Sequence, residues 1–159
     1  MAVIVNGDSA KVSGAVGIAV SRYNDNITSK LLQGAIATLS SHGIAESKIM
    51  VVWAPGAWEL PLLCQDLIAQ PQISAVIGLG CVIRGETTHD QHINRAVSMA
   101  MMDLSLKHSK PVAFGLLTCN TLEQAIHRSG GRVGNKGDEA AGAIIEMLKV
   151  RSQLAQSAI

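Results

Sequence analysis

The sequence predicts an α/β fold in which a four-stranded parallel sheet is covered by helices on both faces. Four apolar runs each precede a segment whose apolar residues recur at helical spacing, which is typical of alternating strands and helices. The runs are continuously apolar, as expected for strands that are buried on both faces. We therefore expect a three-layer α/β/α sandwich with right-handed crossover helices and flavodoxin-like topology, formed by residues 1–159 as a single domain.

The N-terminal half contains the first two strand–helix units. The first strand is the apolar run at residues 15–20, which ends at the polar segment SRYND. A helix follows and ends near Gly43, because glycine is favoured just beyond a helix C-terminus. The second strand spans residues 49–53, and its helix extends over about residues 59–69 with Pro61 in the first turn.

The third unit contains the apolar run at residues 74–83. The segment RGETTH follows this run, and a helix then extends over about residues 90–108. Thr88 and Gln91 have the spacing of a capping box, in which two side chains bond to the free backbone N–H groups of a helix start. This pair therefore predicts where the helix begins. The methionines of the helix are expected to fill the core: Met99, Met101 and Met102.

The fourth unit ends in a glycine-rich connection. Its strand spans residues 112–118, and Thr121 with Gln124 marks the start of a short helix that reaches Arg128. The glycines that follow predict a flexible connection. A last helix is expected at about residues 138–154.

The composition excludes several classes of function. Thirteen Lys and Arg residues against 12 Asp and Glu residues leave a formal charge of +1, and no basic run offers a nucleic-acid surface. No apolar run approaches the roughly 18 residues of a membrane span, and the N-terminus lacks the pattern of a signal peptide. Three cysteines without metal-ligand spacing indicate reduced thiols. We expect a cytoplasmic protein that binds neither nucleic acid nor membranes.

Three loops are expected to form a ligand site. In open parallel sheets ligands bind beyond the carboxyl ends of the strands, which here carry SRYND, APGAWELP and RGETTH. Tyr23 and Trp58 are either core aromatics, which is the usual place for such side chains, or rings that stack on a planar heterocycle. The second reading has a specific reason, because each residue follows a strand in a polar or Pro/Gly loop.

The third loop predicts an anion site. A helix start presents free backbone N–H groups and a positive dipole end, which suit a phosphate group bound by Thr87 and the backbone around Glu86. His89 would stand beside that anion and exchange protons near neutral pH. The alternative is that Thr88 only caps the helix and that His89 only occupies its first turn.

A metal site at the same place is the weaker hypothesis. His89, Asp90 and His92 are residue types that bind zinc, but no further ligand cluster follows them. Two glycine-rich segments, GLGCVI and GGRVGNKG, lack the complete dinucleotide and Walker motifs. The absence of G-x-S-x-G disfavours a serine hydrolase. The sequence therefore indicates neither a bound metal nor a nucleotide cofactor.

The motifs taken together resemble the lumazine synthase family. The matching stretches are SRYND, APGAWELP, GCVIRGETTH, PVAFGLLTCNTLEQA and SGGRVGNKG, in the family's order and spacing from about residue 14 to residue 149. The resemblance implies a transferase that condenses 5-amino-6-(D-ribitylamino)uracil with 3,4-dihydroxy-2-butanone 4-phosphate, through an imine, loss of phosphate and ring closure. The product would be 6,7-dimethyl-8-ribityllumazine, formed in the penultimate step of riboflavin biosynthesis without metal or cofactor.

The resemblance also implies a role for each residue of the site. Tyr23 takes the ring-stacking position, His89 transfers protons, and Glu59 accepts hydrogen bonds from the ribityl hydroxyls. The pyrimidine and its ribityl chain would be held by Tyr23, Asn24, Ala57, Trp58, Glu59, Val82, Ile83, Phe114 and Lys136. The phosphate group would be held by Glu86, Thr87 and Arg128.

An oligomer with active sites between adjacent subunits is implied as well. Phe114, Arg128 and Lys136 match positions that the family contributes from a neighbouring subunit. The predicted topology agrees for Arg128, because its helix starts at the ligand edge of the sheet and runs away from it. The family's unit is a homopentamer, and the compact SGGRVGNKG connection resembles that of members whose pentamers form a 60-subunit icosahedral capsid. The N-terminal strand is expected to pair with a neighbouring subunit, and riboflavin synthase is a further expected partner.

The chain departs from the family beside His89. An aromatic residue usually follows that histidine, whereas here Asp90 follows it and is placed to orient His89 or to favour its protonated form. Two other functions stay open. One is a riboflavin-binding, lumazine-binding or shell-forming protein on the same scaffold without turnover, and the other is a metal-dependent hydrolase centred on His89 and His92. The intact site motifs favour the synthase.

Overall fold

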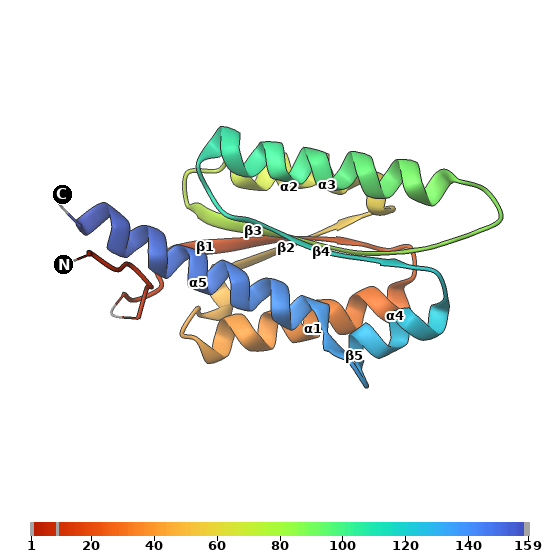
Figure 1. The fold of residues 1–159 in the computed structure, drawn as a ribbon, viewed down its shortest axis with the longest axis horizontal. Coiled ribbons are helices and arrows are strands. Elements are labelled where there is room, and N and C mark those ends of the chain that lie inside the picture. The colour runs from red at the N-terminus through yellow and green to blue at the C-terminus, as the bar shows by residue number, and fades with distance from the viewer. Residues whose placement is uncertain (1, 9, 158–159) are drawn as a thin grey trace.

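A computed structural model describes residues 2–8 and 10–157 and shows a four-stranded parallel sheet between two layers of helices (Figure 1). The strands lie in the order β2-β1-β3-β4. They are β1 (Ala15–Ser21), β2 (Ile49–Ala54), β3 (Ile73–Ile83) and β4 (Val112–Cys119). Because all four are parallel, their carboxyl ends meet at one edge of the sheet. The predicted three-layer α/β/α architecture is confirmed.

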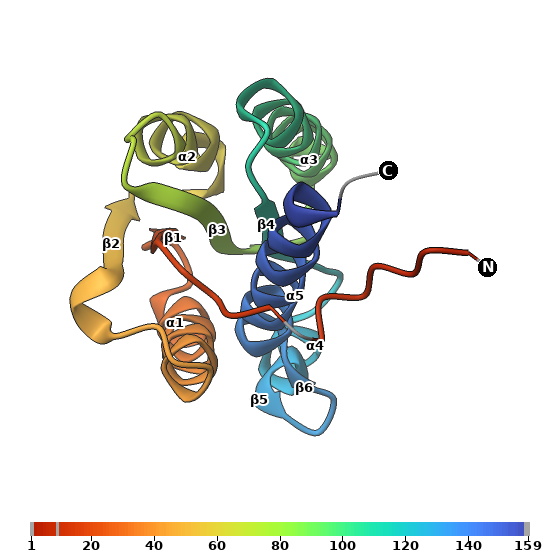
Figure 2. The same cartoon turned by 90° about the vertical axis from the view of Figure 1, so that its left-hand side faces the viewer.

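The helices lie in two layers, one on each side of the sheet (Figure 2). One layer contains α1 (Asp25–Ser41), α4 (Leu122–Arg128) and α5 (Lys136–Gln156), and the other contains α2 (Leu60–Ile68) and α3 (His89–His108). Short 3-10 turns, η1 (Glu46–Lys48) and η2 (Ala57–Glu59), precede β2 and α2. Each of the four strands predicted for the sheet and each predicted helix is therefore present, with ends that differ by a few residues.

Two apolar cores hold the three layers together. On the side of α1 and α5, Leu31 is buried with Ile18 and Ile77 of the sheet. On the side of α2 and α3, Met101 is buried with Val76. Val76 and Ile77 are neighbours in β3 and point into opposite cores, because successive side chains of a strand alternate between its faces. This double burial is why the strands are continuously apolar in sequence.

The predicted ends of α1 and α4 are confirmed by their hydrogen bonds. Gly43 has a φ of 90°, its N–H donates to Ser40 O at 3.0 Å, and the N–H of Ile44 donates to Leu39 O at 3.1 Å. This left-handed glycine and the two bonds form a Schellman motif that ends α1. At the start of α4, the hydroxyl of Thr121 accepts a hydrogen bond from the backbone N–H of Gln124 at 3.2 Å.

The capping box predicted at the start of α3 is wrong, although the helix begins where expected. Thr88 precedes the helix with φ −87° and ψ 12°, and its side chain makes no capping hydrogen bond. A capping side chain reaches the helix N–H groups from an extended backbone, which Thr88 does not have. The expectation for the methionines is also partly wrong. Met101 is buried, but Met99 and Met102 are 61% and 62% exposed.

The predicted flexible connection is a short ordered hairpin. Strands β5 (Ser129–Gly131) and β6 (Gly134–Asn135) pair antiparallel, and α5 follows them directly. Asn135 caps α5 by accepting hydrogen bonds from the N–H groups of Gly137 and Asp138, and its side-chain amide donates to Lys30 O of α1 at 2.9 Å. A Cβ atom at Gly137 would overlap the carbonyl oxygen of Leu31. Glycine here therefore lets α5 approach the backbone of α1.

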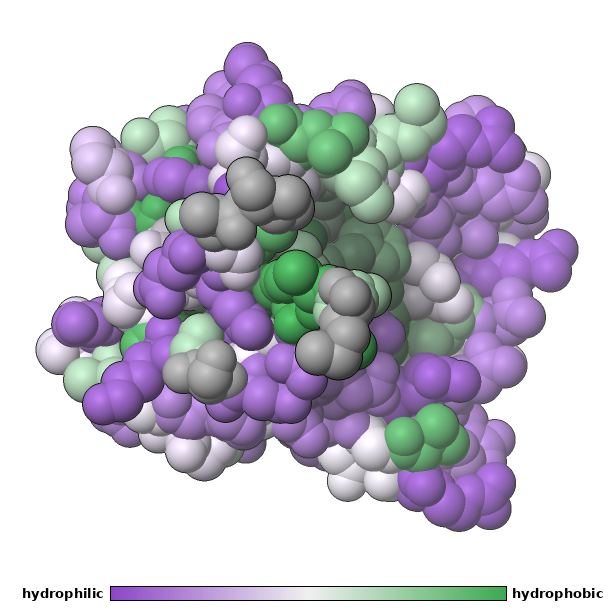
Figure 3. Space-filling view, turned by 60° about the vertical axis from the view of Figure 1, so that its left-hand side comes forward, coloured by the Kyte–Doolittle hydropathy of each residue, from purple (hydrophilic) through white to green (hydrophobic). Residues whose placement is uncertain are grey.

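The N-terminal segment lies outside the sheet in the single chain. Residues 2–7 form no strand, and Val3 and Ile4 are 72% and 77% exposed. The segment is attached to the body by the N–H of Gly7, which donates to the side-chain oxygen of Gln153 at 2.7 Å. The face that carries both termini is hollowed near its centre, and hydrophobic side chains gather around the hollow (Figure 3). None of the described helices is long and apolar enough to cross a membrane.

Candidate active site

The carboxyl ends of β1, β2 and β3 surround a pocket of about 240 Å³, which we call the β1–β3 pocket. All three predicted loops meet here, because each of them follows one of these strands. The pocket is lined by Tyr23, Asn24, Gly56, Ala57, Trp58, Glu59, Cys81, Val82, Ile83, His89 and Ile93. It thus combines flat aromatic, apolar, carboxylate and imidazole groups in a space of the size that a small heterocycle needs.

The two aromatic residues of the pocket are surface residues. Tyr23 is 74% exposed and Trp58 is 59% exposed, so neither ring belongs to the core. Both rings line the same pocket. Their assignment to the core is therefore wrong, and stacking on a planar ligand stays a prediction.

Asn24 connects the first loop to the neighbouring strand. Its backbone has φ 62° and ψ 47°, a left-handed conformation that asparagine tolerates better than most residues. Its side-chain nitrogen donates to the carbonyl oxygen of Cys81 at 3.0 Å. This bond holds the start of α1 against the end of β3 and occupies one of the amide's two hydrogens, so the other hydrogen and the side-chain oxygen are left for a ligand.

Glu59 is held by the second loop. One of its carboxylate oxygens accepts a hydrogen bond from the backbone N–H of Gly56 at 3.0 Å. A carboxylate has further lone pairs that can accept hydrogen bonds from hydroxyl groups. The Pro-Gly turn therefore sets the acid at the rim of the pocket with acceptor capacity to spare, beside Ala57 and Trp58.

His89 is the first residue of α3 and is exposed at the pocket. Its Nδ1 lies 3.1 Å from the hydroxyl oxygen of Thr87. The predicted contact between Asp90 and His89 is absent from the described residues. Instead, one carboxylate oxygen of Asp90 is buried without a hydrogen-bond partner in the described part of the chain. Thr87, rather than Asp90, is the residue that contacts the imidazole.

Glu86 and Thr87 lie in the exposed loop before α3 and do not line the β1–β3 pocket. They are placed directly before the helix start, where a phosphate would meet backbone N–H groups. Within residues 2–8 and 10–157, no three His, Cys, Asp or Glu side chains are grouped as a metal site would require. His92 therefore has no ligand set to join.

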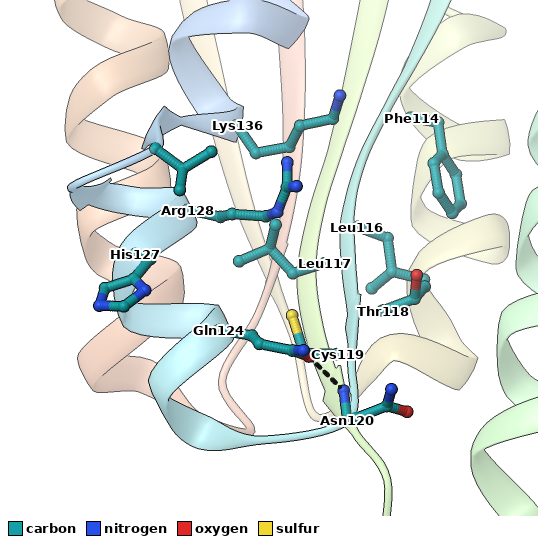
Figure 4. A pocket seen from close by; sticks show the side chains of 11 residues that line it. Phe114, Leu116, Leu117, Thr118, Cys119, Asn120, Gln124, His127, Arg128 and Lys136 are labelled. Atoms are coloured by element: carbon teal, nitrogen blue, oxygen red, sulfur yellow. Dashed lines mark hydrogen bonds between the residues drawn. The ribbon is translucent and has the colours of Figure 1, made fainter.

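Phe114, Arg128 and Lys136 are not in the β1–β3 pocket. They line a second pocket of about 640 Å³, which we call the β4-edge pocket because β4 is the last strand of the sheet (Figure 4). Arg128 and Lys136 lie on one side of it and Phe114 on the other (Figure 4). Residues 116–119 of β4 all contribute, so the pocket extends around the free edge of the strand. No described residue lines both pockets.

The hairpin and the α1–α5 contact position the two cations of this pocket. Arg128 is the last residue of α4, the hairpin β5–β6 follows, and Lys136 is the first residue of α5. Asn135 ties this junction to Lys30 of α1. In the single chain the ammonium group of Lys136 pairs with Glu139 at 3.1 Å. Two positive groups at one pocket suit a ligand that carries negative charge.

Four further residues of the β4-edge pocket have polar side chains that sequence reasoning missed: Thr118, Asn120, Gln124 and His127. The side-chain oxygen of Gln124 accepts a hydrogen bond from the N–H of Asn120 at 2.8 Å (Figure 4). The capping spacing of Thr121 and Gln124 was a signal for this turn, but not for a pocket. A pocket at the outer edge of a sheet has no motif in the sequence of one chain.

Two cysteines lie in the walls of the pockets, and both are free thiols. Burial raises the pKa of Cys81, in the β1–β3 pocket, to about 12, and the neighbouring Cys119 adds to the rise. Burial also raises the pKa of Cys119, in the β4-edge pocket, although the positive charge of Arg128 acts in the opposite direction. Neither thiol is activated as a nucleophile.

Comparison with known proteins shows the family of this chain. Residues 13–152 match the sequence profile of the family described as 6,7-dimethyl-8-ribityllumazine synthase. A relative with that name from Rhodopirellula baltica is 52% identical over 142 residues, which are 89% of this chain and 92% of the relative. The profile match includes every residue of both pockets. The chain therefore belongs to the 6,7-dimethyl-8-ribityllumazine synthase family.

Proposed function

We propose that this protein is a transferase that condenses 5-amino-6-(D-ribitylamino)uracil with 3,4-dihydroxy-2-butanone 4-phosphate, giving 6,7-dimethyl-8-ribityllumazine and phosphate. The observation that carries the proposal is the β1–β3 pocket, in which His89 lines the same space as two exposed aromatic rings and a carboxylate. Family membership supports it, because the relative from Rhodopirellula baltica is named for this product. Amine addition to a ketone, loss of phosphate and ring closure balance without an oxidant or a reductant.

In the proposed complex the pyrimidine occupies the β1–β3 pocket. Tyr23 stacks on its ring, since the exposed phenol is a flat surface at the mouth of the pocket. The walls are apolar where Val82 and Ile83 line them, and Ala57, Trp58, Glu59 and Asn24 supply the contacts to the ribityl chain. Glu59 accepts from the hydroxyls, for which its carboxylate has acceptor capacity.

The sugar phosphate is proposed to bind at the start of α3. Glu86 and Thr87 supply the loop contacts, and the helix N-terminus supplies backbone N–H groups and a favourable dipole. His89 then lies between the phosphate and the pyrimidine, where it moves protons during imine formation and loss of phosphate. Arg128 adds a planar donor for the phosphate, and Lys136 and Phe114 complete the site.

We infer that the last three residues come from a neighbouring subunit. They lie in the β4-edge pocket, which shares no described lining residue with the β1–β3 pocket, so one chain holds the two halves of a site at different places. The strand β4 has a free edge, and the exposed residues Val3 and Ile4 have the β-branched character of a strand that could pair with another subunit. The exposed methionines Met99 and Met102 leave α3 a further surface for contacts between subunits.

The proposed assembly is a pentamer, with a 60-subunit shell as its larger form. A head-to-tail contact that joins the β4-edge pocket of one chain to the β1–β3 pocket of the next completes every site only in a closed ring. The compact β5–β6 hairpin is consistent with this arrangement because it leaves the β4-edge pocket open. Association with riboflavin synthase and a cytoplasmic location remain predictions.

The direct test is turnover by the purified protein. Both substrates are mixed with it in a buffer that contains a chelator, and lumazine absorbance and phosphate release are followed together. Equal amounts of lumazine and phosphate are expected, and a constant rate with increasing chelator would count against the metal-dependent hydrolase. If the protein assembles and binds lumazine but forms no product, the synthase assignment fails and a binding or shell protein takes its place.

A further inference from the structure

The two ring nitrogens of His89 have different surroundings. Its Nδ1 lies 3.1 Å from the hydroxyl oxygen of Thr87, and within residues 2–8 and 10–157 its Nε2 has no hydrogen-bond partner. The ring also lies close to Gly85, since a Cβ atom added to that glycine would be 3.3 Å from Cε1 of the ring. Thr87 and Gly85 thus set how the ring stands, and Nε2 is the nitrogen left for proton transfer.

The partner of Nδ1 is a hydroxyl group, and this decides which tautomers of the imidazole can form the hydrogen bond. A hydroxyl both donates and accepts, so the bond can form with Nδ1 protonated or unprotonated. A carboxylate only accepts and would hold a proton on Nδ1 permanently, but the carboxylate of Asp90 makes no hydrogen bond to His89 in the described structure. The direction in which the Thr87 hydrogen points therefore selects the tautomer of His89.

We propose that Thr87 is the positioning residue of His89, and that a bound phosphate group selects the His89 tautomer whose Nε2 is free to act as a base. The inference rests on the proposed function, which places the phosphate of the sugar substrate beside Glu86 and Thr87. A phosphate oxygen accepts the Thr87 hydroxyl hydrogen. The hydroxyl oxygen is then only an acceptor for the imidazole, and the proton of His89 resides on Nδ1.

The proton count is unchanged by this step. One proton leaves Nε2 and one is gained at Nδ1 through solvent, while the Thr87 hydrogen bond turns from Nδ1 to the phosphate. Without phosphate the hydroxyl is free to donate to Nδ1, and Nε2 then carries the proton. His89 is thus prepared as a base while the substrate keeps its phosphate, and the preparation ends when phosphate departs.

The test measures the tautomer directly with inorganic phosphate as the probe. The protein is labelled with ¹⁵N-histidine, and solid-state ¹⁵N spectra, which tolerate a large assembly, are recorded as phosphate is added. His89→Asn identifies the His89 signals. In the wild type, phosphate is expected to move the Nδ1 signal towards the protonated position and the Nε2 signal towards the unprotonated one.

Three variants separate this role from a structural one. Thr87→Val removes the hydroxyl at nearly constant shape and should abolish the response, whereas Thr87→Ser keeps a hydroxyl and should retain it. Thr88→Val is the matched control, because the neighbouring Thr88 side chain makes no capping bond, and it should respond like the wild type.

Two results would overturn the inference. One is phosphate binding to the wild type with unchanged His89 signals, and the other is an unchanged response in Thr87→Val. If inorganic phosphate does not bind at the Thr87 loop at all, the inference also fails, because no phosphate oxygen is then present to accept the Thr87 hydroxyl hydrogen. The turnover assay distinguishes this failure from failure of the proposed function. Lumazine formed by a wild-type protein whose His89 signals do not respond to phosphate overturns the inference alone, whereas absence of lumazine overturns the proposed function.

Discussion

The side-chain nitrogen of Asn24 donates a hydrogen bond to the carbonyl oxygen of Cys81, 3.0 Å away, and so joins the start of α1 to the end of β3. Asn24 adopts a left-handed backbone conformation at this point. The adjacent residue, Tyr23, lines the same pocket, and its backbone N–H donates to the carbonyl oxygen of Pro55 at 3.1 Å. The loop that carries Tyr23 and Asn24 is therefore held both by a side-chain bond to β3 and by a backbone bond to the second loop.

Two replacements of Asn24 separate the contribution of its side-chain hydrogen bond from that of its left-handed backbone conformation. Asn24→Ala loses the hydrogen bond and places an unfavourable residue in the left-handed region, so we expect a loss of about 2 kcal/mol in the free energy of unfolding. Asn24→Gly loses the bond but tolerates the backbone, and should lose only about 1 kcal/mol. Chemical denaturation of both variants measures the difference. Equal losses would show that the backbone conformation contributes nothing.

Removal of the His89 imidazole should slow the reaction without disturbing the fold. His89 is exposed, and among the described residues its side chain makes one hydrogen bond, to Thr87, so His89→Ala leaves no cavity in either core. Turnover is expected to fall by roughly 10- to 10,000-fold, the range for one acid–base group. Steady-state kinetics measure the loss, and gel filtration checks the assembly. Wild-type turnover in the variant would remove His89 from the mechanism.

Mixed assemblies test whether each site draws on two chains. His89→Ala damages the β1–β3 half and Arg128→Ala the β4-edge half, so we expect each variant alone to be impaired, Arg128→Ala mainly in its use of the sugar phosphate. Co-expression in equal amounts should restore about a quarter of the sites, because that fraction pairs two intact halves.

The control for this experiment is Arg128→Ala co-expressed with Lys136→Ala. Both changes lie in the β4-edge half, so no combination of these chains contains an intact one. Activity in this mixture should stay at the level of the single variants. No recovery in the first mixture would place Arg128 and His89 in sites formed by the same chain. Recovery in the control would show that Arg128 and Lys136 do not belong to the same half of the site.

Replacement by alanine should change the stability in opposite directions at two glycines of α5. Gly137→Ala puts a Cβ against the carbonyl oxygen of Leu31 and forces α1 and α5 apart, which should cost about 3 kcal/mol. Gly142→Ala meets no atom within 4 Å and should stabilise the helix by up to about 1 kcal/mol. Thermal unfolding of the two variants gives the comparison. A mild effect of Gly137→Ala would mean that the helices need not approach so closely.

The buried thiols predict a loss of stability at alkaline pH. Burial raises the pKa of Cys64 from 9.0 to about 12, and Cys81 is raised to the same value by burial and by Cys119. Above pH 9 the unfolded chain loses thiol protons that the folded chain keeps. The free energy of unfolding should therefore fall between pH 9 and pH 12, by up to about 1.4 kcal/mol per pH unit for each thiol.

The variant Cys64→Ala provides the comparison for this pH dependence. Its free energy of unfolding should be lower at every pH, because a buried side chain is shortened. The decline of that free energy above pH 9 should be shallower than in the wild type. Urea denaturation at several pH values between 8 and 11 separates the two effects. Identical slopes in both proteins would assign the alkaline decline to other groups.

The fold was predictable because the central strands β1 and β3 are buried on both faces and the edge strands are apolar as well. Each of them is a continuous apolar run, and Gly43 and Thr121 mark helix ends by chemistry that acts within a few residues. The capping box predicted at Thr88 is wrong for an equally local reason. Its spacing to Gln91 satisfies the capping pattern, but the φ and ψ of the residue decide whether the side chain can reach the helix.

The β1–β3 pocket was also predictable in outline, because the carboxyl ends of parallel strands meet at one edge. Topology alone brings SRYND, APGAWELP and RGETTH together. The contact between Thr87 and His89 was not predictable, since a side-chain orientation depends on rotamers. The β4-edge pocket was not predicted as a pocket, because its shape depends on the free edge of β4 and on the β5–β6 hairpin. The glycines of that hairpin predicted a flexible connection instead.

The burial of Cys81 has a consequence for chemical selectivity. The proposed reaction holds a ketone, and then an imine, beside a sulfur atom in the pocket wall. With a pKa of about 12, only about one thiol in 100,000 carries the charge at pH 7 that would let it attack such an electrophile. The thiol of Cys81 therefore does not compete with the amine of the substrate for the carbonyl carbon, and the protein is not inactivated by a thiohemiketal at this cysteine.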